Sequence, residues 1–496
     1  MTTTLIVLPL AAALVVWLLP LPGRVAGGLG LLAALAELTL WIVAAARFDF
    51  SQGLQLEDRQ SWFGDLGVSY HVGFYGFSLW LAGLTIVVST AAIGYALWAG
   101  RERGRAYHGL LLFLLGAIVG VFTAQDLLLF YVFFEAMLIP LYVLIGVWGG
   151  PRRLRATATF VIYTMAGSLL MLASIVVFGL SQGTFSLVES GTSSNNWVFL
   201  GFLAAFAVKA PIFPFHGWLV DAYRESPPEV AAILSGVVSK AAVYGLLRIV
   251  IAKFPEPVDD FQVPILAFAA ISLVYGSLLA FRAPDIRSVT AYSSMAQMGL
   301  ITLGLFSLNE VGVNGAILQS VAHGLVSASL FLLAGMVEVR TGTSAFSGLG
   351  GMARGRPVLA TVLMTTGIIA LAVPGSVAFA GEFLILAGVY REGWGWAVVG
   401  AFAIVLAAMY MLRLISAVLH RSRGSDVREE APDLRPLELS LVVPLVALLL
   451  FLSAWPALIS ERSFPTLIGM EIDASAAGGW TAYAPLDDRG VTVSFP

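Results

Sequence analysis

The chain has 496 residues, of which 59% are hydrophobic and only 11% are charged, with a net charge of -3. Soluble domains carry roughly a quarter charged residues, so this composition excludes a soluble enzyme and indicates a protein that crosses a membrane many times. Because cysteine is absent, disulfides and cysteine-ligated iron–sulfur or haem groups are excluded from this chain.

Fourteen apolar segments approach or exceed the roughly 20 residues that a helix needs to cross a bilayer. Long continuous apolar runs are unlike the alternating strands of a membrane barrel, so we predict an all-α bundle. The loops are too short for a soluble catalytic domain, and only 48–76 and 461–496 could form a small lid. The segments are 3–22, 25–47, 78–99, 108–124, 127–148, 157–180, 197–219, 230–252, 262–281, 287–306, 312–336, 357–389, 394–419 and 437–460.

Basic residues gather in alternate loops of this arrangement. With the N-terminus outside, 17 basic residues lie in inside loops and 6 in outside segments. Since lysine and arginine are retained on the cytoplasmic side, we expect a multi-pass protein of the bacterial inner membrane with both termini outside. No basic patch with interleaved aromatic residues is present, so the expected partner is the lipid bilayer and not nucleic acid.

Four basic residues, Lys209, Lys240, Arg248 and Arg413, fall within predicted spans. Only three of the 27 basic residues are lysines, and two of those three are in this group. An intramembrane lysine costs about 2.5–3.5 kcal/mol to insert. Arginine keeps its proton, whereas lysine can release it. We infer that Lys209 and Lys240 are kept because they titrate; the alternative is that they are structural cations in ion pairs.

The acidic residues of the spans are few: Glu37, Asp126, Glu135 and Glu382. Asp126 stands where a helix begins, so we interpret it as an N-terminal cap. Glu37 has an apolar setting without an obvious cation, and its role is open. A carboxylate beside an ammonium in a low dielectric keeps both groups charged, so a Glu135–Lys209 pair could act as a switch that controls proton release.

Helical spacing favours a path of titratable groups. Lys240, Tyr244 and Arg248 are four residues apart and share one face of their helix. Lys209 and His216 are seven apart and also share a face if that helix continues. Two of these residues are lysines for which we expect titration, so the spacing predicts connected sites.

His216 and His323 lie within predicted spans, and histidine exchanges protons near neutral pH. A single histidine in a helix is more often a satisfied hydrogen-bonding group. The presence of two lysines and two glutamates in other spans favours a proton-carrying role for His216 and His323. Hydroxyl groups of the segment 292–299 could hold water between these charged sites.

Helix breakers stand beside the charges. Pro211 and Pro214 follow Lys209, and Pro374 with Gly375 precedes Glu382. Proline interrupts a helix, and in a membrane the freed backbone groups line protein or a wet cavity. Two interrupted helices in corresponding halves are typical of inverted-repeat transporters. We therefore predict broken helices seven and twelve within two inverted five-helix repeats.

This pattern divides the chain into four parts. Residues 1–107 form helices one to three with the outside loop 48–76. Residues 108–252 and 253–419 form the first and second repeats, helices four to eight and nine to thirteen. Residues 420–496 hold helix fourteen and an outside tail.

Six segments of the chain form a recognisable set. They are "DLLLFYVFFEAMLIPLYVLIG" (126–146), "AFAVKAPIFPFHGWLVDAY" (205–223), "ILSGVVSKAAVYGLLR" (233–248), "DIRSVTAYSSMAQMGLITLG" (285–304), "GAILQSVAHGLVSASLFLLAGM" (315–336) and "PGSVAFAGEF" (374–383). Together they resemble the antiporter-like membrane subunits of respiratory complex I, the proton-pumping NADH:quinone oxidoreductase, over about 60–420. Within that superfamily the chain is most similar to the chain M (mitochondrial subunit-four) type, because a glutamate, Glu382, follows "PGSVAFAG".

The resemblance implies a role for each site residue. Glu135 is similar to the helix-five glutamate that pairs with the helix-seven lysine, here Lys209. Lys240 is similar to the central lysine that links two half-channels, and Glu382 to the terminal proton site of helix twelve. The connecting histidines are implied to be His323 and His216.

The resemblance also implies that no cofactor and no metal bind to this chain. FMN, iron–sulfur clusters and quinone would belong to the complex as a whole. Other membrane subunits of complex I, including neighbouring antiporter-like chains, would be its partners. The chain would thus be a subunit of a translocase and would carry out no redox chemistry itself.

Gln297 departs from the pattern, because many relatives have histidine there. A histidine relay is therefore not expected at that position, and a bound water could replace it. Two alternatives remain. One is a subunit of a multisubunit cation/proton antiporter, and the other is a subunit of a related membrane hydrogenase or ferredoxin-linked complex.

Overall fold

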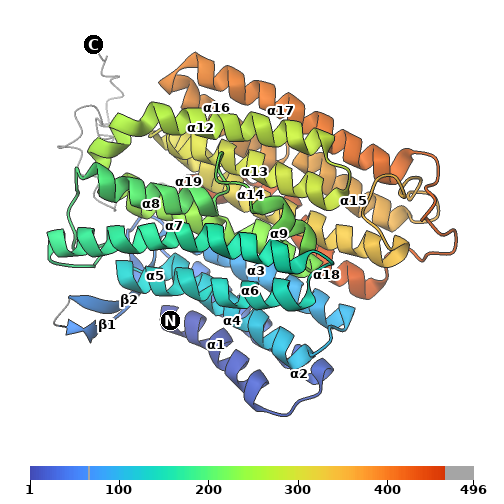
Figure 1. Ribbon diagram of the computed structural model, residues 1–496, viewed down its shortest axis with the longest axis horizontal. Coiled ribbons are helices and arrows are strands. Elements are labelled where there is room, and N and C mark those ends of the chain that lie inside the picture. The colour runs from blue at the N-terminus through green and yellow to red at the C-terminus, as the bar shows by residue number, and fades with distance from the viewer. Residues whose placement is uncertain (65–66, 464–496) are drawn as a thin grey trace.

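Long helices run side by side along the longest axis of the molecule, as the computed structural model in Figure 1 shows. The structure describes residues 1–64 and 67–463. Ten helices of this described part are long and apolar enough to cross a membrane. The prediction of an all-α polytopic membrane protein is confirmed, and each of the fourteen predicted segments overlaps one or more helices.

The N-terminal part contains the only strands of the described residues. β1 and β2 form an antiparallel hairpin in which Gln55 is opposite Phe74 and Phe63 is opposite Val68. The elements are α1 (Thr2–Leu18), α2 (Gly23–Arg47), β1 (Gln55–Phe63), β2 (Val68–Phe74), α3 (Gly76–Ala99) and α4 (Gly104–Thr123). The sequence predicted a loop at 48–76 and did not predict this hairpin.

The middle of the chain continues as helices, several of which are joined end to end. They are α5 (Leu127–Ala136), α6 (Leu138–Trp148), α7 (Arg153–Gln182), α8 (Asn196–Lys209), α9 (Leu219–Glu225), α10 (Pro228–Ile233), the π-helical η2 (Leu234–Val238), α11 (Lys240–Gly245), the π-helical η3 (Leu246–Ile251), α12 (Pro255–Arg282) and α13 (Ile286–Leu305). As predicted, Asp126 caps α5, because its Oδ1 accepts hydrogen bonds from the N–H groups of Leu128 and Leu129 at 2.9 and 3.2 Å.

The remaining helices complete the bundle. They are α14 (Glu310–Thr341), α15 (Pro357–Ala370), α16 (Val377–Glu392), α17 (Trp394–Ile415), the π-helical η4 (Ser416–His420), α18 (Pro436–Ala454) and α19 (Ala457–Ser463). The predicted tail beyond 463 lies outside the described residues. The division of the chain at 107, 252 and 419 stays a prediction; α4 begins at Gly104, four residues before the predicted start of the first repeat at 108.

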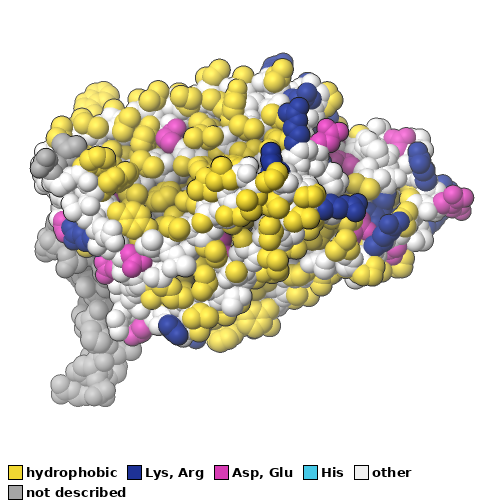
Figure 2. Space-filling view, turned by 90° about the horizontal axis from the view of Figure 1, so that it is seen from below, with side chains coloured by type: hydrophobic (Ala, Val, Ile, Leu, Met, Phe, Trp, Pro, Cys, Tyr) yellow, Lys and Arg dark blue, Asp and Glu magenta, His cyan; other side chains and the backbone are white. Residues whose placement is uncertain are grey.

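The two ends of the bundle differ in chemistry. β1 and β2 lie at one end, which we call the hairpin end (Figure 1). The loops 100–103, 342–356 and 421–435 lie at the other, which we call the arginine end. Figure 2 shows hydrophobic side chains over most of one lateral face, while most of the Lys and Arg side chains visible there lie toward the arginine end. This distribution is that of a membrane protein with an apolar belt.

Two helical segments form the centre of the bundle. The spans Pro228–Ile251 and Glu310–Thr341 are buried over the whole length of their most apolar window. The two backbones touch at Gly236 and Gly324, because a Cβ atom on Gly324 would lie 2.6 Å from the carbonyl oxygen of Gly236. Only glycine permits such an approach. The close contact places Lys240 and His323, which belong to different halves of the chain, beside one another.

Both predicted helix breaks are present, and both use a serine hydroxyl from a neighbouring helix. After α8, the N–H of Phe213 donates to Ser272 Oγ of α12 at 2.7 Å. Between α15 and α16, the N–H of Val377 donates to Ser453 Oγ of α18 at 2.9 Å. Backbone groups freed in a membrane must find such partners within the protein. The breaks are therefore built into the packing.

The first break ends its helix well before the end of the predicted segment 197–219. The prolines predicted an interruption there, and α8 ends at Lys209 because Pro211 cannot donate the next hydrogen bond of the ladder. Trp218 returns to the helix end, and its indole N–H donates to the carbonyl oxygen of Val208 at 3.0 Å. Lys209 is thus the last residue of a helix and not part of a continuous helical face.

Candidate functional site

Lys240 and His323 form the link between the two halves. Lys240 Nζ lies 2.7 Å from His323 Nδ1, and the side chains are 0% and 5% exposed. Either group can be the donor, since a protonated lysine donates to a neutral imidazole and a protonated Nδ1 donates to a neutral amine. A proton can therefore pass between helices α11 and α14 without movement of heavy atoms.

The π-helical turn before Lys240 supplies further contacts. Lys240 Nζ donates to the carbonyl oxygen of Ser235 at 2.9 Å and to Ser239 Oγ at 3.3 Å. The Ser235 hydroxyl contacts Ser294 Oγ at 2.9 Å and Ser327 Oγ at 2.5 Å. Irregular turns of this kind often occur at functional sites because they free a backbone carbonyl. Hydroxyl groups from three helical elements thus meet at Ser235, whose carbonyl oxygen contacts the central lysine.

Lys209 lies in an aromatic setting at the end of α8. Its side chain is 2% exposed, and Nζ lies 4.7 Å from the centre of the Phe134 ring. Glu135 is half-buried on α5 and is close enough for its charge to act on Lys209. Among the described residues, however, no carboxylate oxygen is within 4.0 Å of Lys209 Nζ. The expected direct Glu135–Lys209 ion pair is absent, and the two groups are separated neighbours.

Glu382 lies near the start of α16 and is 2% exposed. Gln297 Nε2 donates to its Oε1 at 2.9 Å, and Gln319 Nε2 lies 3.5 Å from the same oxygen. Gln319 also donates to Gln297 Oε1 at 2.7 Å. The second carboxyl oxygen has no hydrogen-bond partner among the described residues. One oxygen is thus held by amides while the other is available to bind a proton.

His216 is separate from these groups. It lies in the break after α8, half-buried, with its ring stacked on Phe213 at 5.7 Å and edge-on to Tyr275 at 5.5 Å. A shared helical face for Lys209 and His216 was expected only if the helix continued, and it does not, because α8 ends at Lys209. Among the described residues, His216 Nδ1 has no hydrogen-bond partner.

The structure also shows the surroundings of Glu37 and of the predicted Lys240–Tyr244–Arg248 face. Tyr244 and Arg248 both point to the loop at 124–125, while Lys240 contacts His323, so the three do not form one chain of contacts. Glu37 on α2 is completely buried, and neither of its carboxyl oxygens has a partner among the described residues.

Sequence reasoning missed some residues of the site. Gln319 and Ser327 lie on α14 and contact Gln297 and Ser235, respectively. Gln319 is four residues before His323, and Ser327 four after it, so all three occupy neighbouring turns of one helix. Polar residues four positions before and after His323 are the sequence signal by which Gln319 and Ser327 could have been predicted.

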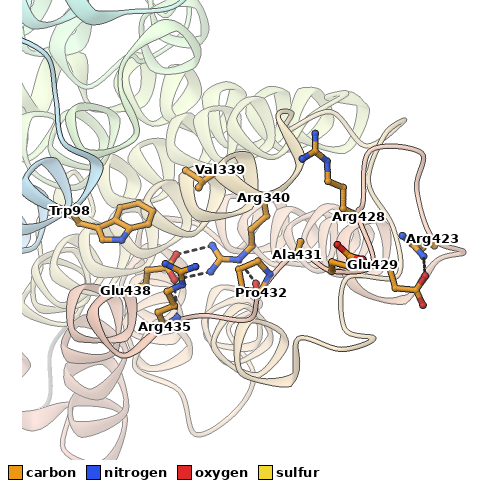
Figure 3. Close-up of a pocket in the computed structure, with 11 residues that line it drawn as sticks. Trp98, Val339, Arg340, Arg423, Arg428, Glu429, Ala431, Pro432, Arg435 and Glu438 are labelled. Carbon is orange, nitrogen blue, oxygen red and sulfur yellow. Dashed lines mark hydrogen bonds and ion pairs between the residues drawn. The ribbon is translucent and has the colours of Figure 1, made fainter.

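A cavity at the arginine end does not belong to this site. Its volume is about 670 Å³, and Figure 3 shows Arg340 pointing toward Glu438 at its centre, with Trp98 on the far side. Arg340 donates to both oxygens of Glu438 at 2.8 Å and to the carbonyl oxygen of Pro432 at 2.8 Å. This buried ion pair fastens the loop 421–435 to α14 and α18.

The described residues offer few ligands for a metal or cofactor. Within 1–64 and 67–463, no group of three or more His, Asp or Glu side chains is placed to hold a metal ion. What the arrangement can do is move protons between buried amine, imidazole and carboxyl groups.

Comparison with known proteins gives consistent matches. Residues 124–407 match the family model described as NADH:quinone oxidoreductase/Mrp antiporter, TM. The chain is 33% identical over 463 residues to NADH-quinone oxidoreductase subunit M of Rickettsia prowazekii, an alignment that covers 91% of this chain and 94% of the relative.

Solved structures agree. A chain of respiratory complex I from Thermus thermophilus with bound NADH superposes with a TM-score of 0.87 at 31% identity, covering 95% of this chain and 99% of that one. A chain of the Mrp complex from a Dietzia species gives a TM-score of 0.85 at 21% identity, covering 96% and 98%, and this second match shows the fold alone.

Proposed function

The chain belongs to the NADH:quinone oxidoreductase/Mrp antiporter transmembrane family, and we propose that it moves protons along its line of buried titratable side chains. It is a membrane subunit of NADH:quinone oxidoreductase, a translocase complex, and its partners are other membrane subunits of that complex. The subunit spans the membrane several times.

The proposed route has three parts. Glu135 and Lys209 receive a proton in the first half, Lys240 and His323 pass it across the centre, and Glu382 releases it from the second half. The observation that carries the proposal is the 2.7 Å contact between Lys240 and His323, because it joins the two halves. His216 stands beside the route, at the surface of the first break, and we assign it to proton exchange with solvent at that break.

The orientation is part of the proposal. The hairpin end faces the outside and the arginine end faces the cytoplasm of a bacterial inner membrane, with the N-terminus outside. The bias of basic residues toward the loops of the arginine end supports this orientation. The C-terminal residues beyond 463 are outside the described part, and their outward placement rests on the sequence.

The energy comes from elsewhere in the complex. We propose that FMN, iron–sulfur clusters and quinone are bound by other subunits, while this chain binds no cofactor. The chemistry of its buried side chains supports this division, since they are proton carriers without a cysteine to ligate a cluster.

The test exchanges lysine for arginine, which keeps the charge but does not release its proton. In Lys209→Arg we expect the complex to assemble and NADH-driven acidification of inverted membrane vesicles to fall by about tenfold or more. Lys253→Arg is the matched control, because Lys253 is the third lysine of the chain and lies outside the route. It should acidify as the wild type does, with assembly checked on native gels.

The outcomes separate the candidate functions. Normal acidification by assembled Lys209→Arg would overturn the proposed role of Lys209 as a titrating group. If NADH-driven acidification were unaffected in that variant while sodium–proton exchange failed, the chain would instead be acting as a cation/proton antiporter subunit.

A further inference from the structure

Arg248 is a fully buried cation that the proposed route does not use. It lies on η3 and is 1% exposed. Nη2 donates to Gln125 Oε1 at 3.2 Å and to the carbonyl oxygen of Leu187 at 3.1 Å, and the guanidinium lies 4.9 Å from the centre of the Tyr75 ring. Among the described residues no carboxylate is within 4.0 Å of it, and its Nε has no partner. Its positive charge is therefore held only by neutral groups.

Three extended chain segments close around this arginine at the hairpin end. The N–H of Gln125 donates to the carbonyl oxygen of His71 at 2.8 Å, and the N–H of Leu187 donates to the carbonyl oxygen of Gln125 at 2.8 Å. Isolated bridges also pair Val72 with Ala124. The end of β2, the start of α5 and the loop after α7 thus form one hydrogen-bonded collar, and Arg248 reaches it from the central helix.

An aromatic layer lies next to the collar. Tyr244 Oη donates to the carbonyl oxygen of Ala124 at 3.0 Å. Its ring packs on Phe77, Phe122 and Phe130 at 5.7, 5.9 and 6.0 Å between ring centres, and all of these side chains are buried. Between Lys240 and the hairpin end, the first half therefore offers packed rings and the Arg248 cation, and the collar itself holds the buried carboxylate of Asp126, whose Oδ2 accepts from the N–H of Ser69 at 3.0 Å.

The hairpin end of the second half contains a nearly buried oxygen acceptor. Exposed carboxylates occur at this end in both halves, with Glu310 and Glu392 in the second half and Glu57 and Glu189 in the first. Asn314 is nearly buried, and its Oδ1 has no hydrogen-bond partner among the described residues. Carboxylates and a free carbonyl oxygen attract protons and water, whereas a permanent cation repels protons.

We propose that Arg248 is a fixed-charge seal that prevents protons at Lys240 from leaving directly through the hairpin end of the first half. The inference rests on the proposed function. Arg248 is eight residues beyond Lys240, about 12 Å along the helix axis, and arginine stays protonated in proteins. The positive charge of Arg248 repels a proton that moves from Lys240 toward the hairpin end. The proton therefore passes to His323 and the second half.

The experiment measures passive proton leak through the assembled complex. Vesicles that receive no NADH are given an acid pulse, and a pH-sensitive dye follows the decay of the gradient. We expect the gradient to decay about threefold faster or more in Arg248→Gln than in the wild type, because a neutral polar side chain removes the electrostatic barrier. Adding Lys240→Met should abolish the extra leak, since the proton must pass through Lys240.

A second variant separates charge from space-filling. Gln125→Glu has nearly the same shape but places a carboxylate 3.2 Å from Arg248 Nη2, where it neutralises the local charge. If the charge of Arg248 forms the seal, the pH gradient should also decay faster in Gln125→Glu than in the wild type. If Arg248→Gln fails to assemble, this variant alone decides. A wild-type decay rate in Gln125→Glu would overturn the proposal, as would a leak in Arg248→Gln that persists with Lys240→Met.

Failure of this inference is distinguishable from failure of the proposed function. The leak is measured without NADH, whereas the proposed function is tested by NADH-driven acidification in Lys209→Arg. Normal leak in the Arg248 and Gln125 variants together with lost pumping in Lys209→Arg would overturn the seal alone. Normal pumping in Lys209→Arg would overturn the role of Lys209. The leak measurement would still decide whether Arg248 blocks proton passage.

Discussion

The two broken helices hold their titratable groups in different ways. At the first break Lys209 ends α8 beside the Phe134 ring, with Glu135 nearby but not in contact. At the second break Glu382 follows the interruption, and amides of Gln297 and Gln319 lie at one of its oxygens. In both halves the helix break is stabilised by a serine of a neighbouring helix. A loosely held cation lies beside the break in the first half, and a hydrogen-bonded carboxyl group lies beside it in the second.

The difference indicates that the two halves have different roles in proton transfer. A cation held mainly by an aromatic face can change its interaction with Glu135 through small movements, because no strong hydrogen bond fixes it. A carboxyl group held by amides keeps its position while its second oxygen binds and releases protons. The first half is therefore suited to responding to its surroundings, and the second half to releasing protons at a fixed place.

The largest effect is expected when the two halves are disconnected. Lys240→Met keeps a flexible side chain of similar length but removes the amine that contacts His323. NADH-driven acidification should fall by about tenfold or more in assembled complex, because His323 loses the amine with which it exchanges a proton. Acidification above about half of the wild-type rate would show that the halves are connected by another path.

An intermediate effect is expected at the second break. Gln297→Leu removes the donor to Glu382 and the acceptor of Gln319, so the carboxyl group loses its fixed position. We expect acidification to fall by about threefold to tenfold. Gln182→Leu removes an amide that contacts the carbonyl oxygen of Thr192, away from the site, and should leave the rate unchanged. Equal rates in the two variants would contradict the role of Gln297.

The smallest effect is expected at the first break. Phe134→Leu removes a cation–aromatic contact worth about 0.5–1 kcal/mol, so the rate of acidification should fall by roughly twofold to fivefold. Phe199→Leu has the same loss of volume on α8, but Phe199 packs on Phe254 and Phe261. If both variants acidify equally, packing and not the contact with Lys209 explains the result.

Much of the fold could be predicted because its signals are local. Apolar runs of the length of a bilayer define the helices, the carboxyl group of Asp126 marks the start of α5, and prolines mark both breaks. The candidate residues Lys209, Lys240 and Glu382 stand out because charge is rare in such segments. These features need no knowledge of which helices pack together.

The remaining features depend on contacts between distant segments. The pairing of Lys240 with His323, 83 residues later, requires the packing of α11 on α14. The separation of Lys209 from His216 depends on where the proline break ends the helix, so the condition for one shared face is not met. The roles of Glu135, Lys209, Lys240, His323, His216 and Glu382 in proton transfer stay predictions.

The contact between Gly236 and Gly324 has a mechanical consequence. Where helices meet through side chains, rotamer changes can absorb small shifts, but here one backbone rests directly on the other. The central helices therefore move as one stiff unit at this level. If a neighbouring subunit shifts, we expect the two central helices to move together. The two interrupted helices then act as hinges that absorb the shift.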